Sequence, residues 1–514
     1  MPGGKTASWT PRWYDAALVD EQGYDVIVVG AGNAGMSAAH AARERGSRVL
    51  VLEKADRDWS GGNSAFTAGA IRIAHGGLPE LRDLLEGIDD ELAAKTDLDP
   101  YTPDEFTADM RRVTLGRGDA EMARILVDDS GPAVRWLHER GLRFRLMYER
   151  QSYEVDGRHR FWGGLAVGTV DGGEGLMEQH RAAAERTGIE LRHGAGVVDL
   201  VRDEAGAVRG VVVRGGGRDE TVAARAVVLA AGGFESNPQL RAAYLGPNWD
   251  VAKVRGTPHN TGEVLMAALA HGAQAYGNWS GCHAIQWDAD APPTGDREIT
   301  NRFSRQSYPV GIVVNRRGER FVDEGEDFRN YTYAKFGAEV LKQPEGVAAQ
   351  VFDAKTVGLL RTIDYEAPGA ARVDADTLGE LADGLGVDRQ GFERTVADFN
   401  AAIRAGEFDP SVKDGKRTVG IAPPKSNWAV PIDEPPFVGF RITCGITFTF
   451  GGVRVDADAR VLDAGGRPIP GLCAAGELVG GLFFHNYPGG TGLTAGAVFG
   501  RRAGYAAAEA ALGR

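Results

Sequence analysis

The sequence predicts an α/β fold in which a largely parallel sheet is flanked by helices and is interrupted along the chain by an inserted α+β segment. The first observation is a short apolar, β-branched run, Asp25–Val29, typical of a strand buried on both faces. The second is that a glycine turn and an alanine-rich helix follow this strand at once, as in a β–α–β unit. The third is a change of character between Trp279 and Pro431, where aromatic residues, arginine and proline become more frequent.

Length and composition limit what the protein can be. A chain of 514 residues with 43% hydrophobic and 25% charged residues is expected to form two or more globular domains. The net charge of −13 argues against a nucleic-acid partner. No apolar run approaches the roughly 20 residues that span a membrane, and residues 1–19 lack the apolar core of a signal peptide. We therefore expect a cytoplasmic protein.

The chain contains three cysteines, Cys282, Cys444 and Cys473, and none of them forms a CxxC or CxxCH group. This spacing predicts no disulfide framework, no metal site, no iron–sulfur cluster and no covalently attached haem. We expect these side chains to be buried free thiols.

The stretch 24–54 carries the clearest functional signal. Gly30, Gly32 and Gly35 follow the first strand at GxGxxG spacing, which combines a tight turn, close approach of backbone to a pyrophosphate, and close packing of helix on strand. Glu53 stands where a carboxylate accepts hydrogen bonds from an adenosine ribose. The stretch therefore predicts a dinucleotide-binding unit. Its expected helix and second strand are Ala34–Arg45 and Arg48–Leu52.

Two further loops offer backbone donors to the same ligand: WSGGNS at 59–64, and the double glycine that ends the buried run VVLAAGG at 227–233. The aromatic and basic segment 148–172 suits a substrate-side loop or, alternatively, a packed surface loop. Other expected helices are Gly131–Arg140, beginning at Pro132, Gly175–Thr187, a capped helix within Thr257–Gly272, and Gly492–Leu512. Other expected strands are Leu142–Met147, Ala195–Arg202, Val208–Arg214, Phe437–Val455 and Pro470–Leu478. The chain then divides into a leader (1–22), a nucleotide-binding domain in two parts (23–277 and 432–514) and an inserted capping domain (278–431).

A series of ordered motifs resembles the FAD flavoproteins of the fumarate reductase and succinate dehydrogenase type over nearly the whole chain. The motifs are GAGNAG with Glu53, SGGNSAFTAGA, VVLAAGGF, VVNRRGERFVDE, FTFGGV, AAGELVGG and GGTGLTAGAVFGRRAG. Within this group, DEGEDFRNYTYAKFG and FFHNYPGGTGLTAGAVFG look most like the tricarballylate dehydrogenase branch. The resemblance implies a Rossmann-like FAD-binding domain, discontinuous in the chain, with the isoalloxazine between residues 61–69 and 490–494.

The resemblance also implies which residues hold FAD. Glu477 in AAGE would bind ribityl or ribose hydroxyls. Membrane-bound members attach FAD through a histidine where this chain has Asn63, so we expect non-covalent FAD. The expected cofactor-binding residues are Gly30, Gly32, Asn33, Ala34, Gly35, Glu53, Lys54, Gly61, Gly62, Asn63, Ser64, Gly69, Val197, Gly232, Glu477, Gly492 and Leu493.

Enzymes of this type transfer a hydride between a C–H bond and flavin N5 and move a proton at the neighbouring carbon. By resemblance, the proton-transfer residue is Arg329, although one residue is inserted before it. Because the pKa of arginine exceeds roughly 12, it could act only in a dry site with a relay through Glu326 or Asp327. The alternative for Arg329 is a structural salt bridge to one of these acids.

The substrate end keeps part of the family pattern. His283 matches a histidine that binds a substrate carboxylate, although it could equally be an ordinary core residue. Phe448 stands where a second substrate histidine is expected, and Tyr487 replaces the arginine that clamps a carboxylate. Losing that guanidinium argues against fumarate or succinate. Tyr487 with the following Pro-Gly also resembles the 3-ketosteroid dehydrogenases, and an aromatic wall against the flavin is its alternative role.

The leading hypothesis is an FAD-dependent dehydrogenase or reductase of a C–C bond next to an electron-withdrawing group, in a small carboxylate such as tricarballylate. Its catalytic residues would be Arg329, Tyr487 and His283. The alternatives are a dehydrogenase of a larger cyclic substrate, such as a steroid ketone or tetrapyrrole precursor, and a flavin subunit that only relays electrons. The expected partners are the small-molecule substrate and an external electron acceptor or donor, such as a separate redox protein.

Overall fold

The computed structural model describes residues 23–215 and 218–513. The expected leader at 1–22 lies outside these described residues. Among the helices of the described ranges, none combines the length and the apolarity that crossing a membrane requires.

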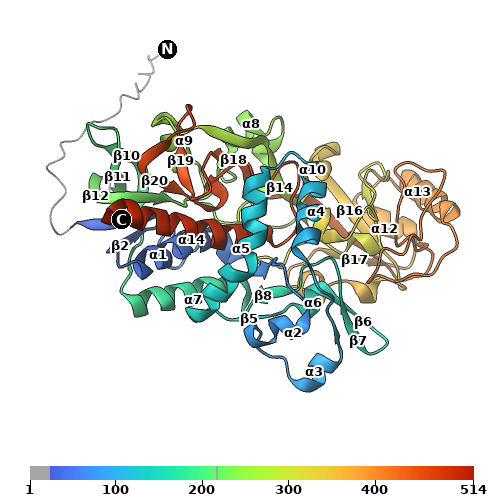
Figure 1. Cartoon of the computed structure of the whole chain (residues 1–514). Coiled ribbons are helices and arrows are strands. Elements are labelled where there is room, and N and C mark those ends of the chain that lie inside the picture. Colours follow the sequence, from blue (N-terminus) through green and yellow to red (C-terminus); the bar gives the residue numbers. More distant parts are fainter. Residues whose placement is uncertain (1–22, 216–217, 514) are drawn as a thin grey trace, which may run out of the picture.

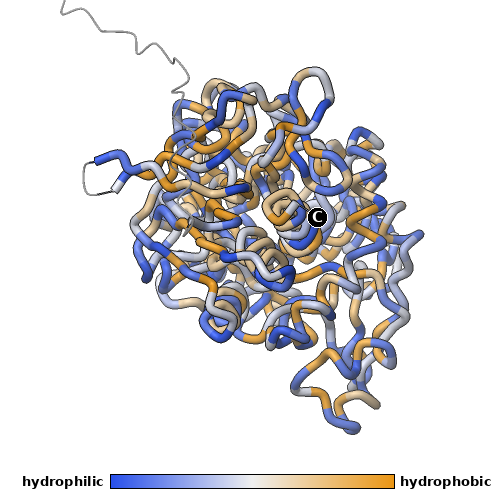
Figure 2. Tube along the Cα trace, turned by 60° about the vertical axis from the view of Figure 1, so that its left-hand side comes forward, coloured by the Kyte–Doolittle hydropathy of each residue, from blue (hydrophilic) through white to orange (hydrophobic). Residues whose placement is uncertain are grey.

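The larger part of the molecule contains both the first and the last described elements, β1 (Tyr24–Val29) and α14 (Thr491–Leu512). A smaller part, which includes α12 (Leu378–Leu385) and α13 (Arg389–Ala402), projects from one end (Figure 1). Hydrophilic segments gather at the periphery of both parts, and hydrophobic segments run through the interior (Figure 2). The larger part is thus assembled from two separated stretches of chain, as the sequence predicts.

An eight-stranded mixed sheet forms the centre of the larger part. β1 lies in its middle and pairs in parallel with β2 and β12, and all four residues of β2 are buried, which explains its uninterrupted apolar sequence. The loops that follow β1 and β12 meet at the same edge, where the Ala230 N–H donates to the Val29 carbonyl at 2.8 Å. The other strands are β2 (Val49–Leu52), β9 (Glu190–Arg192), β10 (Gly196–Arg202), β11 (Val208–Gly215), β12 (Arg218–Leu229), β19 (Arg460–Leu462) and β20 (Pro468–Ala474).

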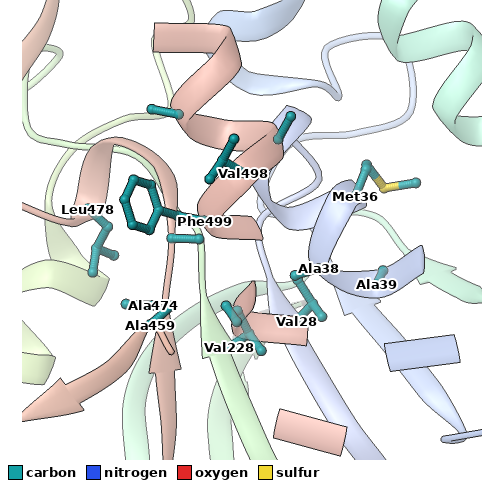
Figure 3. Close-up of a cluster of buried hydrophobic side chains, with 14 of the residues drawn as sticks. Val28, Met36, Ala38, Ala39, Val228, Ala459, Ala474, Leu478, Val498 and Phe499 are labelled. Carbon is teal, nitrogen blue, oxygen red and sulfur yellow. The ribbon is translucent and has the colours of Figure 1, made fainter. Parts of the chain in front are cut away.

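Helix α1 (Asn33–Glu44) packs directly on α14, so residues from the two ends of the fold lie side by side (Figures 1 and 3). Glycines allow this approach, because a Cβ on Gly500 would lie 2.4 Å from the Ala34 carbonyl oxygen. Val28, Val228 and Phe499 fill the space between the sheet and the two helices. Burying one such side chain stabilises the fold by roughly 1.5–3 kcal/mol.

A six-stranded sheet forms the centre of the smaller part. The long strand β18 (Phe437–Val453) pairs with four of its neighbours, among them β14. The β14–β18 ladder is irregular between Asn278 and Cys282, where the expected capping domain begins. The other strands are β13 (Lys253–Val254), β14 (Ala275–Asp288), β15 (Ile312–Asn315), β16 (Val347–Phe352) and β17 (Arg372–Ala375).

The remaining elements cover these two sheets. Two three-stranded sheets consist of β3 (Ala70–Ile71), β5 (Phe144–Leu146) and β8 (Val167–Thr169), and of β4 (Thr96–Asp97), β6 (Ser152–Val155) and β7 (Arg158–Phe161). The other helices are α2 (Leu78–Leu81), α3 (Asp90–Ala94), α4 (Pro103–Val113), α5 (Ala120–Glu139), α6 (Tyr148–Gln151), α7 (Gly172–Thr187), α8 (Pro238–Tyr244), α9 (Glu263–Ala270), α10 (Tyr333–Leu341) and α11 (Thr362–Tyr365).

One helix prediction is wrong in its boundaries. The expected helix 131–140, beginning at Pro132, is the second half of α5, which begins at Ala120 after the capping residue Asp119. The Asp119 carboxylate accepts hydrogen bonds from the N–H groups of Glu121 and Met122. Pro132 lies within the helix on its exposed face, so proline here is a tolerated interior residue rather than a start signal.

Candidate active site

A large cavity follows the edge of the central sheet and continues into the smaller part. Most of the residues expected to bind a cofactor line it. They are Gly30, Gly32, Asn33, Ala34, Glu53, Lys54, Gly62, Asn63, Ser64, Val197, Gly232, Glu477, Gly492 and Leu493. Gly35, Gly61 and Gly69 do not line it. Gly61, for example, packs against the protein instead, because a Cβ on this residue would lie 2.9 Å from the Met177 side chain.

The glycine turn at one end of the cavity depends on two close contacts. Gly30 has φ +101, and a Cβ there would lie 2.4 Å from the Ala230 carbonyl oxygen. A Cβ on Gly35 would lie 1.9 Å from the Gly30 carbonyl oxygen, so only glycine lets α1 start this close to β1. The N-cap residue of α1 is Gly32, which has no side chain, and the Asn33 N–H donates to Ser64 Oγ at 3.1 Å. This helix end faces the cavity and suits a phosphate group.

Glu53 is held firmly at this end. One carboxylate oxygen accepts a hydrogen bond from the Ala31 N–H at 2.8 Å and the other accepts one from the Ala55 N–H at 2.9 Å. Ala31 belongs to the glycine turn, so this bond fixes the acid relative to the phosphate-binding helix end. Lys54 also lines the cavity, but its amine donates to Thr261 Oγ1 at 2.6 Å and pairs with Glu263 at 3.0 Å.

The two asparagines expected at the cofactor have side chains that bind the protein itself. Asn33 donates to the Leu493 carbonyl at 2.8 Å and contacts His180 Nε2 at 3.0 Å, which joins α1 to α14 and α7. Asn63 donates to Glu235 at 2.6 Å and to the Thr447 carbonyl at 2.7 Å. Their amides therefore shape the cavity wall.

The buried acid Glu235 lies beside Asn63, and Asn260 donates to both Glu235 and Glu477. Glu477 lines the cavity and accepts hydrogen bonds from the Thr449 N–H and hydroxyl at 2.8 and 3.1 Å. Burial raises the pKa of Glu235, and burial together with the charge of Glu235 raises the pKa of Glu477 well above its usual range. A protonated carboxyl in this pair can donate as well as accept hydrogen bonds, which suits a ligand hydroxyl.

Five aromatic side chains surround the middle of the cavity: His283, Tyr333, Phe448, Phe483 and Tyr487. His283 stacks on Phe448 with ring centroids 5.1 Å apart and meets Tyr487 edge-on at 4.8 Å. Neither ring nitrogen of His283 has a hydrogen-bond partner within the described ranges, and burial lowers its pKa well below the usual value. His283 is therefore neutral and can donate one N–H to a ligand. The hydroxyl groups of Tyr333 and Tyr487 are hydrogen-bonded to each other.

Arg329 does not line the cavity. It begins a short 3₁₀ turn, its guanidinium donates to the Arg150 carbonyl, and its Cζ lies 4.6 Å from the centre of the Trp162 ring. Burial lowers its pKa. The alternative role of Arg329, a salt bridge to Glu326 or Asp327, is wrong. Glu326 pairs with Lys335 at 2.7 Å, and Asp327 pairs with Arg112 and, at 3.5 Å, with Lys413.

The structure identifies three arginines that the sequence did not single out: Arg150, Arg255 and Arg361 line the far end of the cavity. Arg150 pairs with the fully buried Asp364 at 3.0 Å, and Arg361 pairs with the same carboxylate. Burial lowers the pKa of Arg361 to about 9. Arg150 lies in the aromatic and basic segment 148–172, and its place at the cavity favours a substrate-side loop over a packed surface loop.

The site chemistry fits FAD. The open end of α1 suits a pyrophosphate, Glu53 and Glu477 suit hydroxyl groups, and the aromatic side chains suit the face or edge of a flavin ring. The three cysteines are free and buried, as expected. Within residues 23–215 and 218–513, no group of three or more His, Cys, Asp or Glu side chains is arranged to hold a metal ion.

Comparison with known proteins agrees with this fit. The profile of the family described as FAD binding domain matches residues 25–493. Fumarate reductase (cytochrome) of Shewanella frigidimarina is 29% identical over 94% of this chain and 77% of its own length. 4-Oxocyclohexanecarboxylate 2-dehydrogenase of Sinomonas cyclohexanicum is 29% identical over 91% of this chain and 89% of its own length.

Solved structures share the fold over nearly the whole chain. The open conformation of a flavocytochrome c3 fumarate reductase has a TM-score of 0.70 and 27% identity, covering 96% of this chain and 80% of its own. A 3-ketosteroid-Δ4-(5α)-dehydrogenase of Rhodococcus jostii has a TM-score of 0.71 and 26% identity, covering 97% of this chain and 99% of its own. The chain therefore belongs to the FAD-binding domain family and is an FAD-dependent oxidoreductase of the fumarate reductase and succinate dehydrogenase type.

Proposed function

We propose that the protein dehydrogenates or reduces a carbon–carbon bond next to an electron-withdrawing group of a small polycarboxylate, for which tricarballylate is the leading example. The observation that carries this proposal is the charge at the far end of the cavity. Three arginines line this end of the cavity. Within the described ranges, Asp364 is the one acid that pairs with any of them, and Arg150 and Arg361 share it. Two positive charges therefore remain, which carboxylates of a substrate would neutralise, and a guanidinium can bind a carboxylate with two hydrogen bonds. The relative named as a fumarate reductase acts on an acid of this class.

When bound, FAD would supply the hydride-transferring N5, and the chain supplies orientation and proton transfer. Tyr487 lines the cavity with its hydroxyl bonded to Tyr333, so this pair can hold or release a proton at a bound substrate. His283 offers a neutral N–H that orients a carboxylate or carbonyl oxygen. Arg329 remains the other candidate for proton transfer, and it lies behind the backbone of Arg150.

Replacing Tyr487 by phenylalanine is expected to lower kcat by about 100-fold or more, because general acid–base groups contribute about 10²- to 10⁴-fold. The bound FAD content should not change, since this substitution removes only the hydroxyl. Steady-state kinetics with Arg329→Ala is the matched comparison. A larger loss of kcat in Arg329→Ala, at equal thermal stability and FAD content, would assign the proton transfer to Arg329 instead.

The substrate class is tested by the colour of the flavin. Anaerobic mixing of the FAD-loaded protein with tricarballylate is expected to bleach flavin absorbance, and cis-aconitate is expected to reoxidise the chemically reduced protein. Succinate and a 3-ketosteroid serve as comparisons. Bleaching by the ketosteroid with no response to any carboxylate would overturn the proposed substrate class.

A second candidate substrate is a cyclic oxo acid. The hydroxyl pair of Tyr333 and Tyr487 could polarise a ketone, while the arginines bind a carboxylate on the same ring. The relative named 4-oxocyclohexanecarboxylate 2-dehydrogenase supports this candidate, and the same bleaching assay with 4-oxocyclohexanecarboxylate distinguishes it. A steroid or tetrapyrrole without a suitably placed carboxylate would leave the arginines unneutralised, which is costly in a buried site.

We also propose non-covalent FAD, an external redox partner and a cytoplasmic location. Asn63, which stands at the family's attachment histidine, has its amide engaged by Glu235 and Thr447. Flavin that remains soluble after acid precipitation of the protein is the signature of non-covalent binding. An external electron donor is supported by a relative named NADH:fumarate oxidoreductase, of Klebsiella pneumoniae, of whose length this chain covers 48%. Buried free thiols suit a reducing compartment.

A further inference from the structure

Arg255 is a buried arginine whose backbone is held by a hydrogen bond to a neighbouring strand. It directly follows β13, and its backbone N–H donates to the Ile446 carbonyl of β18 at 2.8 Å. The residue is only 7% exposed. Its guanidinium forms neither a hydrogen bond nor an ion pair with any residue in the described part of the chain, and its buried Nε lacks a partner.

Three other buried arginines have partners for their guanidinium groups. Arg305 pairs with Asp288 at 2.5 Å, Arg320 pairs with Glu324 at 2.5 Å, and Arg241 donates to several backbone carbonyls. Leaving a buried charge without a partner costs several kcal/mol. The exception at Arg255 is therefore informative, because a ligand that brings its own negative charge would remove this cost.

The surroundings of Arg255 indicate that a negatively charged ligand would bind it in the cavity. Arg255 lines the cavity together with the neutral side chains His283, Tyr333 and Tyr487. The nearby acid Asp364 is already bound by Arg150 and Arg361. These two arginines reach the cavity from α6 and from the start of α11, whereas Arg255 reaches it from the β13–β18 side.

We propose that Arg255 binds one carboxylate of the substrate while Arg150 and Arg361 bind another, so that the site selects molecules with at least two carboxylates. This inference rests on the proposed function, since it names the residues and the charge pattern by which the same cavity would choose its substrate. In this proposal Arg255 supplies the carboxylate contact that the family places at the position of Tyr487, but from a different segment of the chain.

The test compares two five-carbon acids that differ in one carboxylate, glutarate and pentanoate. Each is titrated into the oxidised, FAD-loaded protein, and binding is followed by the change in the flavin absorbance spectrum. Wild-type protein is expected to bind glutarate at least about 10-fold more tightly than pentanoate, and Arg255→Met is expected to abolish this preference. Arg441→Met is the matched control, because Arg441 is an exposed partner of Asp290 on the neighbouring strand β18.

If Arg255→Met does not retain FAD, the same titrations are made with Arg255→Gln. Arg255→Lys should restore part of the preference for glutarate, because it restores the positive charge. The proposal is overturned when wild-type protein shows no preference for glutarate, or when a neutral variant keeps it. Arginine-dependent glutarate binding without turnover of any carboxylate would leave the proposal standing and refute the proposed function instead.

Discussion

Replacing Gly35 by alanine is expected to destabilise the protein by more than about 3 kcal/mol, at the upper end of the range for overpacked sites, and to empty the FAD site. In most helix interiors this substitution stabilises by about 0.5–1 kcal/mol. Here the sign reverses because the new Cβ would lie 1.9 Å from the Gly30 carbonyl oxygen. Either α1 moves away from β1 or the glycine turn deforms. Chemical denaturation and the flavin-to-protein absorbance ratio measure the two effects.

Gly358→Ala is the matched control, since Gly358 also lies in a helical turn and a Cβ there has no neighbour within 4 Å. This variant should unfold like the wild-type protein and keep its flavin. A Gly35→Ala protein with unchanged flavin content and stability would mean that α1 can start further from β1 than the structure shows.

Replacing Asp364 by asparagine is expected to cost about 3–5 kcal/mol, the range for removing one partner of a buried ion pair. Asp364 is completely buried and its carboxylate is shared by Arg150 and Arg361. The amide would leave both guanidinium groups charged and uncompensated at the cavity wall. The midpoint of chemical denaturation should fall, and added glutarate should recover part of the loss because a bound dicarboxylate returns negative charge.

Asp374→Asn provides the comparison, because Asp374 forms a half-exposed pair with Arg372 at 2.7 Å and such pairs contribute about 0–1 kcal/mol. Equal denaturation midpoints for the two variants would show that the buried arginines already have sufficient compensation. In that case the surplus positive charge proposed for the cavity would also be wrong.

The nucleotide-binding half could be predicted from sequence because its signals are local. The spacing of Gly30, Gly32 and Gly35 and the acid at Glu53 act within one β–α–β unit, so short-range geometry determines where they lie. Lys54 and Asn63 were expected at the same place and do line the cavity, yet their polar groups bind the protein. Sequence spacing predicts position along the backbone better than it predicts the partner of a side chain.

The substrate end could not be predicted to the same degree, because its residues converge only through tertiary packing. Arg255 and Arg361 come from distant segments, and a single arginine in either segment is indistinguishable from a surface residue until its burial is known. Arg329 occupies the expected place in the chain, but its 3₁₀ turn directs the guanidinium toward Trp162 and the Arg150 backbone. Side-chain direction in such a turn depends on neighbours that the motif does not contain.

The contact of α1 with α14 has a consequence for how the protein is made. The Asn33 side chain reaches the Leu493 carbonyl at 2.8 Å, across 460 positions of sequence. During synthesis, the wall of the flavin site that α1 supplies is made before the wall that α14 supplies. Cofactor loading therefore cannot be completed before α14 has left the ribosome, and the unit of β1, α1 and β2 stays uncovered by α14 until then.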